Sequence, residues 1–237
     1  MPASHLADRV VNYLGHRVHV VRSREVRTLL AWAGDLGGAR LLDVAGGDGY
    51  WASVAARRGA AATCLDLDRP KLDRGRRLEP RPGLVEGDAL GLPFPDQSFD
   101  VVLSVCAIEH FDDGPASTAE MARVLRPGGR LVMSADSLGR ASEWPSLMEA
   151  HRRRYHVQAT YTHASLTSAL GEQGFDVEKH SYLFRSRLAE HLYLALSARG
   201  GRMGWNLAAP LAPVVAASDR VTPNDQGSVV LIAARKA

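Results

Sequence analysis

The chain has 237 residues, of which 46% are hydrophobic and 23% are charged. These values are typical of a globular protein, so the composition excludes a largely disordered chain, and the length allows one large domain or two small ones. The 29 basic and 26 acidic residues leave a net charge of +3, which is too small to indicate a nucleic-acid-binding protein.

The two cysteines, Cys64 and Cys106, stand in apolar surroundings without a disulfide or zinc pattern. No apolar run reaches the roughly 18 residues of a transmembrane helix, and the N-terminal residues lack the basic and apolar regions of a signal peptide. We therefore expect a cytoplasmic protein without a membrane span and without a metal site.

The first half of the chain alternates apolar strands with helices. Strands are expected at 41–44, 61–66, 84–87, 99–104 and 130–135, and helices at 3–14, 23–33, 50–58, 69–78 and 117–125. The start of the last helix is taken from a capping box, Ser117-Thr-Ala-Glu120. This alternation predicts a parallel sheet with helices on both faces.

Beyond residue 136 the alternation stops. Residues 136–160 contain arginines and histidines without a hydrophobic period, so we expect them to be irregular. Leu188, Leu192 and Leu196 give the segment 187–199 an apolar helical stripe. The other expected elements are a helix at 162–172, a strand at 175–183 and a final strand at 228–234.

A glycine-rich segment follows the first strand: residues 40–50 read Arg-Leu-Leu-Asp-Val-Ala-Gly-Gly-Asp-Gly-Tyr. The three glycines let the backbone bend sharply and let a ligand approach it closely. The helix that follows presents unpaired N–H groups to that ligand. Asp43 stands at the end of the apolar strand, where its burial costs several kcal/mol unless it is paired. The pattern indicates a loop that binds a nucleotide-type cofactor.

Gly47-x-Gly49-x-x-Ala52 also satisfies the dinucleotide fingerprint, which is a weak signal by itself. Two carboxylates argue against a nicotinamide cofactor, because Asp43 at the strand end and Asp48 in the loop would repel a pyrophosphate. A ligand with an amino or sulfonium group would instead be attracted to Asp43.

Five blocks carry a family resemblance: Leu-Leu-Asp-Val-Ala-Gly-Gly-Asp-Gly (41–49), Cys-Leu-Asp-Leu-Asp (64–68), Glu-Gly-Asp-Ala-Leu-Gly-Leu-Pro-Phe-Pro-Asp-Gln-Ser-Phe-Asp (86–100), Ser-Val-Cys-Ala-Ile-Glu-His-Phe (104–111) and Arg-Val-Leu-Arg-Pro-Gly-Gly-Arg-Leu (123–131). With them the chain resembles class I S-adenosylmethionine-dependent methyltransferases, and more narrowly the type 11 methyltransferase domain family. One departure is Ala45, where the family usually has a glycine. Since only a methyl group is added there, we expect cofactor binding to survive.

The resemblance implies S-adenosyl-L-methionine as the cofactor and S-adenosyl-L-homocysteine as the product. It places Asp43 near the methionine amino group, and the backbone of Ala45, Gly46 and Gly47 along the methionine and ribose parts. Val105, just beyond the fourth strand, would lie along the methionine part.

The resemblance also implies the residues that hold the nucleoside. Asp66 would accept hydrogen bonds from both ribose hydroxyls, and Leu67 would pack on the adenine. Asp88 would accept the adenine amine, with the N–H of Ala89 near a ring nitrogen. All these positions fall at carboxyl ends of strands, where open α/β sheets bind ligands.

These expectations combine into a Rossmann-like, doubly wound, mostly parallel seven-stranded sheet whose last strand is antiparallel, with a helical cap inserted after strand five. We expect a single methyltransferase domain over 1–237. It divides into N-terminal helices (1–38), the cofactor-binding core (39–135), the acceptor-binding cap with strand six (136–220) and the final strand (221–237).

Histidines and aromatic residues suggest where the methyl acceptor binds. His110 follows the fourth strand and is a candidate base or substrate contact, because histidine is suited to proton transfer near neutral pH; a structural role is the alternative. His151, Tyr155 and His156 in the cap are candidate substrate contacts. An apolar stripe that fits either core or pocket carries Tyr193, Met203 and Trp205.

Three functions are open. The first is methyl transfer to O, N or C of a small, partly apolar metabolite, natural-product or quinone-like. The second is methylation of nucleic acid or protein, which is disfavoured because the loop after the fourth strand reads Ser-Val-Cys-Ala rather than Asn/Asp-Pro-Pro-Tyr/Phe and no basic module is appended. The third is a cofactor-binding protein of this fold without methyl transfer. We favour the first, in a monomer or homodimer that binds neither nucleic acid nor membrane.

Overall fold

A seven-stranded sheet forms the centre of the computed structural model, which describes residues 20–200 and 208–237. The strands are β1 (Arg40–Val44), β2 (Ala61–Asp66), β3 (Gly83–Glu86), β4 (Phe99–Val105), β5 (Leu125–Asp136), β6 (Phe175–Leu183) and β7 (Val229–Lys236). Their order in the sheet is β3-β2-β1-β4-β5-β7-β6. β7 runs antiparallel to both β5 and β6, whereas the other pairs are parallel. The predicted fold class is confirmed.

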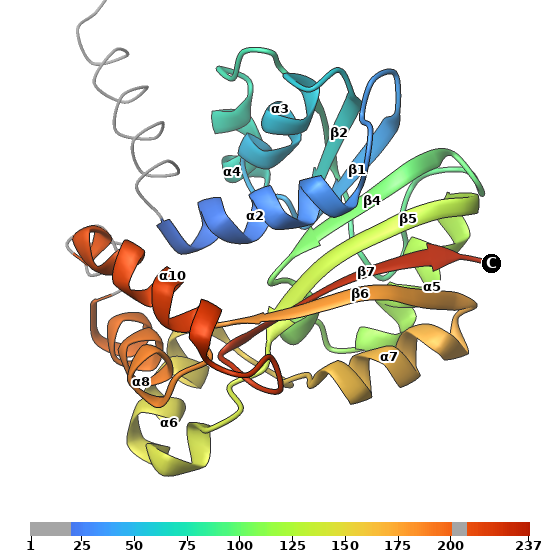
Figure 1. Cartoon of the computed structure of the whole chain (residues 1–237). Coiled ribbons are helices and arrows are strands. Elements are labelled where there is room, and N and C mark those ends of the chain that lie inside the picture. Colours follow the sequence, from blue (N-terminus) through green and yellow to red (C-terminus); the bar gives the residue numbers. More distant parts are fainter. Residues whose placement is uncertain (1–19, 201–207) are drawn as a thin grey trace, which may run out of the picture.

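Helices cover both faces of this sheet (Figure 1). They are α2 (Val20–Trp32), α3 (Tyr50–Ala56), α4 (Arg69–Gly75), α5 (Gly114–Val124), α6 (Pro145–Tyr155), α7 (His163–Glu172), α8 (Arg187–Ala195) and α10 (Ala212–Val221). Short helical turns lie at η1 (Ile108–His110), η2 (Ala141–Glu143), η3 (Leu196–Gly200) and η4 (Ala209–Leu211). Among the described residues, we find no helix with the length and apolar character that a membrane span requires.

The two faces of the sheet bury two separate sets of apolar side chains, because successive strand residues point to opposite faces. In β1, Leu41 packs in the cluster that contains α2 and α3, and Leu42 packs in the cluster that contains α5 and α7. Val101 and Val102 of β4 divide in the same way. Apolar runs of this kind are expected in strands buried on both faces.

The strand order reverses between β1 and β4, so a crevice opens beyond the carboxyl ends of these strands. Figure 1 shows α6, α8 and α10 gathered beyond one end of the sheet, with α2 crossing between them and α3. Helix α2 contacts both β5 and β7, and α6 contacts α8 and η3. The polar side chains at the strand ends are therefore enclosed by helices.

The predicted start of the fifth helix is wrong. Helix α5 begins at Gly114, where the side chain of Asp113 accepts a 2.8 Å hydrogen bond from the N–H of Ala116. Ser117 lies inside the helix and donates to the carbonyl of Gly114, and Glu120 pairs with Arg123. Asp-Gly-Pro gave the real start signal, because aspartate is a good N-cap and proline fits the first turn.

The expectation of irregular structure over 136–160 is also wrong, since α6 occupies 145–155. Its buried face consists of Leu147 and His151, one turn apart. A histidine does not register as hydrophobic, so this face left no visible period in the sequence.

The buried face of α8 lies about one residue further along the helix than the expected apolar stripe. Leu188 is 69% exposed, whereas Ala189, Glu190, Tyr193 and Leu194 are buried. Glu190 is held inside by Arg140, whose N–H donates to its carboxylate at 2.7 Å. The expected helix at 3–14 and the residues Met203 and Trp205 lie outside the described residues.

Replacing Gly49 by alanine in the loop after β1 should destabilise the fold. Its φ is 74°, and an added Cβ would lie 3.1 Å from Leu84 Cδ2 and 3.2 Å from Cys64 Cβ. We expect Gly49→Ala to lower the free energy of unfolding by about 2–4 kcal/mol, through backbone strain and overpacking. Gly91→Ala is the control, because a Cβ there meets nothing within 4 Å. Urea unfolding checks both, and equal stabilities of the two variants would contradict the prediction.

Candidate active site

Asp43 lies beneath the glycine loop as a buried carboxyl group at the end of β1. It is 1% exposed, and its Oδ2 has no hydrogen-bond partner among the described residues. Burial raises the pKa of Asp43 to about 8; the N–H of Ala52 opposes this shift, and the carboxylates of Asp66 and Asp48 add to it. A buried carboxyl group with an unused oxygen is a site for a cationic hydrogen-bond donor.

Gly46 lets the loop close directly over this carboxyl group. A Cβ on Gly46 would lie 2.5 Å from Asp43 Oδ2 and 2.8 Å from Cys64 Sγ. The preceding residue, Ala45, has a φ of 56°, in the left-handed region that favours glycine. This explains why a glycine is the usual residue there, and the alanine retains the same backbone conformation at a cost of about 1–2 kcal/mol.

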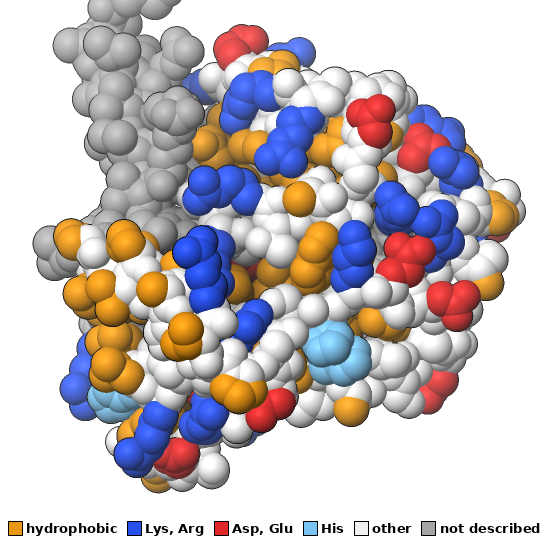
Figure 2. Space-filling model, in the orientation of Figure 1, with side chains coloured by type: hydrophobic (Ala, Val, Ile, Leu, Met, Phe, Trp, Pro, Cys, Tyr) orange, Lys and Arg blue, Asp and Glu red, His pale blue; other side chains and the backbone are white. Residues whose placement is uncertain are grey.

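A pocket of 240 Å³ opens in front of the loop. It is lined by Arg22, Asp43, Ala45, Gly46, Gly47, Asp48, Trp51, Lys71, Arg74 and Val105. Figure 2 shows Lys and Arg side chains on this side of the molecule, around its middle. The pocket therefore combines a buried acid with basic side chains, a donor set that fits the ammonium and carboxylate groups of an amino acid.

Asp66 ties the loop to the end of β2. It is 6% exposed, and its Oδ2 accepts the N–H of Gly47 at 2.7 Å while its Oδ1 accepts the N–H of Asp68 at 2.9 Å. The next side chain, Leu67, is 71% exposed, which is unusual for a leucine at a strand end. The carboxylate and the apolar surface beside it are thus presented together at this edge.

The predicted cofactor residues occupy one edge of the sheet, in two groups. Asp43, Ala45, Gly46, Gly47 and Val105 line the pocket described above. Asp66, Leu67, Asp88 and Ala89 lie at the ends of β2 and β3, outside its lining. The carboxylate of Asp88 is exposed and accepts the N–H of Leu90, whereas Ala89 is buried.

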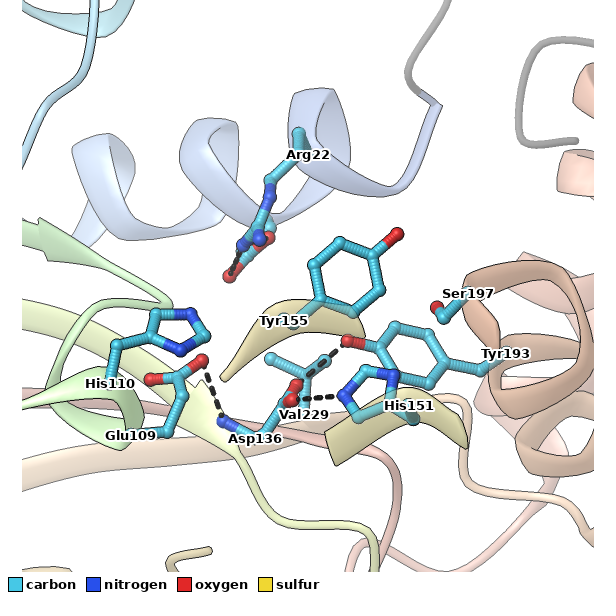
Figure 3. Close-up of a pocket in the computed structure, with 10 residues that line it drawn as sticks. Arg22, Glu109, His110, Asp136, His151, Tyr155, Tyr193, Ser197 and Val229 are labelled. Carbon is cyan, nitrogen blue, oxygen red and sulfur yellow. Dashed lines mark hydrogen bonds and ion pairs between the residues drawn. The ribbon is translucent and has the colours of Figure 1, made fainter. Parts of the chain in front are cut away.

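A second, smaller pocket of 70 Å³ lies beyond the ends of β4 and β5 (Figure 3). Its lining residues are Arg22, Glu25, Glu109, His110, Asp136, His151, Tyr155, Tyr193, Ser197 and Val229. The structure therefore brings His110, His151 and Tyr155 together, as candidate acceptor residues require. His156 is exposed at the end of α6 and is not among the lining residues.

Asp136, at the end of β5, is the centre of the hydrogen bonds in this second pocket. His151 Nε2 lies 2.7 Å from its Oδ2, and the hydroxyl of Tyr193 donates to its Oδ1 at 2.8 Å. Its own N–H donates to Glu109 Oε1 at 3.3 Å. The carboxylate of Asp136 thus fixes side chains from α6 and α8, and its backbone N–H holds the side chain of Glu109 from η1 (Figure 3).

A partly buried ion pair lies between the two pockets. Arg22 lines both, and its guanidinium lies 3.0 Å from Glu25, whose carboxylate is fully buried. The thiol of Cys106 donates to Glu25 at 3.2 Å. Ligand atoms of Cys106, Glu109 and Asp136 lie within 4.8 Å of one another. Because Arg22 already supplies positive charge here, we assign no metal ion to this cluster.

Burial sets the protonation of the groups around the second pocket. It raises the pKa of Glu109, with the carboxylate of Asp136 adding to the shift. It also raises the pKa of Tyr193, again with Asp136 contributing. Burial lowers the pKa of His110, while Asp136 and the carbonyl of His156 oppose that change. His110 therefore favours its neutral form.

Sequence reasoning did not select Arg22, Glu25 and Asp136 as site residues. Two signals were available. Glu25 is a charged residue next to the apolar positions of its helix, and Asp136 follows an apolar strand just as Asp43 and Asp66 do. Neither charge is explained by packing, which marks both as candidates for a functional site.

The strand order, the glycine loop and the carboxylates at the strand ends define a Rossmann-like domain of the class I methyltransferase type. Residues 42–133 match the family model described as a methyltransferase domain, and residues 88–184 match a model for S-adenosyl-L-methionine-dependent methyltransferases. Together these matches span residues 42–184, and S-adenosyl-L-methionine is the cofactor of the methyltransferases that the second model describes.

Two curated relatives and one solved structure illustrate the similarity. A malonyl-[acyl-carrier protein] O-methyltransferase from Methylococcus capsulatus is 35% identical over 160 residues, which are 64% of this chain and 58% of the relative. A ubiquinone/menaquinone biosynthesis C-methyltransferase from Dinoroseobacter shibae is 41% identical over 113 residues, 44% of this chain and 45% of the relative.

The solved structure is geranyl diphosphate C-methyltransferase from Streptomyces coelicolor A3(2), in complex with Mg²⁺, geranyl diphosphate and S-adenosyl-L-homocysteine. It superimposes with a TM-score of 0.67 at 19% identity, covering 91% of this chain and 78% of that chain, and so shows the shared fold. The chain spans less than two thirds of the length of either curated relative.

The raised pKa of Asp43 should make stability depend on pH. The folded-state pKa of about 8 exceeds the value of about 4 in an unfolded chain, so the folded state holds an extra proton between these values. This contribution to stability is present below about pH 4 and is lost as the pH rises through about 8.

The native chain should lose stability as the pH rises from about 5 to about 9, and Asp43→Asn, which carries no titrating carboxyl group there, should not. We therefore expect the free energy of unfolding of the variant, relative to the native chain, to rise by at least about 2 kcal/mol over this range. Urea unfolding at both pH values measures it. Asp73→Asn is the control, because that carboxylate is exposed on α4. If the two variants showed the same pH dependence, Asp43 would not be a buried, uncompensated acid.

Proposed function

We propose that the chain transfers a methyl group from S-adenosyl-L-methionine to a small-molecule acceptor. Asp43 carries the proposal: its buried, unpartnered carboxyl oxygen shares a pocket with Lys71 and Arg74. Asp48 also lines this pocket, and Lys71 pairs with Asp66 at 3.8 Å and with Asp68 at 3.5 Å. Together, the acidic and basic groups are complementary to the ammonium and carboxylate of the methionine part.

The cofactor, when bound, supplies a methyl group on a sulfonium sulfur, which is activated toward displacement by a nucleophile. Asp43 and the backbone of residues 45–47 would hold the methionine part, with Val105 beside it. Asp66 and Leu67 would hold the ribose and one face of the adenine, and Asp88 with the Ala89 N–H would hold its polar edge. The chain accelerates the reaction by fixing donor and acceptor in line, which can supply much of the rate gain.

The second pocket is the proposed acceptor site. It shares Arg22 with the cofactor pocket, so the two lie on either side of one side chain. Its polar groups and the surfaces of Tyr155, Tyr193 and Val229 suit a polar head group on a partly apolar metabolite. Its volume of 70 Å³ fits a small reacting group better than a nucleobase, which favours a small molecule over RNA or DNA. We keep His110, His151 and Tyr155 as acceptor contacts.

Transfer of a radiolabelled methyl group to a panel of metabolites, RNA and protein tests the proposed function. The expected result is label in small molecules. Label in RNA or protein alone would favour the second function, and cofactor binding without any transfer would favour the third.

Asp66→Ala should weaken binding of S-adenosyl-L-methionine by at least about tenfold, because a charged hydrogen-bond acceptor for the ribose is removed. Isothermal titration calorimetry measures the affinity. Asp73→Ala is the matched control, since its carboxylate lies on α4 and pairs only at the surface with Arg69 and Arg76 among the described residues. Unchanged affinity in Asp66→Ala would contradict the assignment of the cofactor site.

His110→Ala should lower turnover at least about tenfold while leaving cofactor affinity intact, because the ring lines the acceptor pocket rather than the cofactor pocket. His180→Ala, which removes an exposed imidazole from β6, is the control. Steady-state kinetics and calorimetry separate the two effects. Unaltered turnover would remove His110 from the acceptor site.

A further inference from the structure

Glu109 stands in the second pocket as a buried carboxyl group with an unused oxygen. Its residue is 1% exposed; Oε1 accepts the N–H of Asp136, and Oε2 has no hydrogen-bond partner among the described residues. Figure 3 shows its side chain rising from η1 toward the pocket, between His110 and Asp136. A buried carboxyl oxygen without a partner can accept a hydrogen bond from a donor group of a ligand.

The charged groups around the pocket indicate which kind of ligand would donate this hydrogen bond to Glu109. Three carboxyl groups, from Glu25, Glu109 and Asp136, line it. The guanidinium of Arg22 pairs with Glu25 Oε2 at 3.0 Å, and His151 Nε2 lies 2.7 Å from Asp136 Oδ2. Glu109 forms no ion pair of this kind within the described residues. The lining therefore has a surplus of acidic groups, which favours a cationic ligand and disfavours an anionic one.

We propose that this pocket binds a primary or secondary amine as the methyl acceptor, and that Glu109 holds the amine N–H and accepts its proton. This inference rests on the proposed function and names its substrate class. The pocket volume of 70 Å³ accommodates an amino group with a few carbon atoms around it.

The proton and electron balance is complete with the groups present. The acceptor enters as an ammonium ion, whose positive charge favours the ionised form of the Glu109 carboxyl group. The ammonium proton then moves to that carboxylate, which leaves a neutral amine with a free electron pair. That pair forms the bond to the methyl carbon, and the pair of the breaking sulfur–carbon bond stays on sulfur. The products are a methylated ammonium ion and the neutral thioether of S-adenosyl-L-homocysteine.

Glu109 suits this role better than His110 does. Its burial and the neighbouring Asp136 carboxylate raise the pKa of Glu109, which makes it a stronger base than an ordinary carboxylate. Burial lowers the pKa of His110, which makes that imidazole a weaker base. A carboxylate also attracts the ammonium ion before the proton moves, whereas a neutral imidazole does not.

The same groups disfavour acceptors that carry negative charge. A carboxylate or diphosphate entering the pocket would face the carboxyl groups of Glu109 and Asp136. The basic side chains there offer little compensation, because Arg22 pairs with Glu25 and His151 contacts Asp136. His110 favours its neutral form. The malonyl and diphosphate groups in the names of two proteins similar to this chain are both anionic. On this proposal the acceptor pocket has diverged from theirs.

Binding of matched probes to the complex with S-adenosyl-L-homocysteine tests the proposal. Calorimetry compares propylamine and isobutylamine with propanol, isobutanol, propionate and isobutyrate, which share their carbon skeletons. We expect each amine to bind at least about tenfold more tightly than the alcohol of the same skeleton, as a charge-assisted hydrogen bond predicts, and the carboxylates more weakly still. Amines that bind no better than the alcohols, or not at all, would overturn the proposal.

Glu109→Gln should reduce the preference for amine over alcohol to below about threefold, because the amide keeps the shape and loses the charge. Asp112→Asn is the matched control: it removes a carboxylate three residues further along the chain that is exposed, and it should retain the full preference. A full preference in Glu109→Gln would overturn the assignment to Glu109.

Cofactor affinity separates this proposal from the proposed function. S-adenosyl-L-homocysteine should bind the native chain and both variants equally. If it failed to bind the native chain, the proposed function would fail first. If it bound and labelled methyl groups moved only to hydroxyl or carbon acceptors, the proposed function would stand and the amine assignment would fall.

Discussion

Burial of carboxyl groups at one edge of the sheet is the constraint on which this structure depends. Asp66 and Asp136 end β2 and β5, Asp43 is the last residue but one of β1, and Glu109 follows β4, so four buried acids lie at the same edge of the sheet. A carboxyl group inside a protein needs a proton, a hydrogen-bond donor or a counter-ion. Each of the four meets that need differently, and the differences show which carboxyl groups retain an unused oxygen.

Asp66 and Asp136 are largely satisfied by the chain itself. Backbone N–H groups donate to Asp66, and His151 and Tyr193 contact Asp136. Asp43 and Glu109 each retain an oxygen without a partner in the part of the chain that the structure describes. One belongs to the cofactor pocket and the other to the acceptor pocket. Methyl transfer requires two sites side by side, and the unsatisfied acids mark one in each.

Much of the fold was predictable because the strands are short apolar runs with clear ends. The cofactor edge was predictable too, since its acids and glycines lie within a few residues of strand ends. The acceptor pocket was predictable only in part: His110, His151 and Tyr155 were candidates from the sequence. Its other polar residues were not, because Arg22, Glu109, Asp136 and Tyr193 come from four separate elements. Helix α6 was missed for a related reason: its buried face includes His151, whose partner, Asp136, becomes visible only in three dimensions.

The position of the cofactor relative to Asp43 tests the central claim most directly. A crystal structure of the chain with S-adenosyl-L-homocysteine would show it. The account predicts the amino nitrogen of the ligand within about 3 Å of Asp43 Oδ2, beneath the loop closed by Gly46. A ligand bound elsewhere, or with its amino group turned away from Asp43, would contradict it.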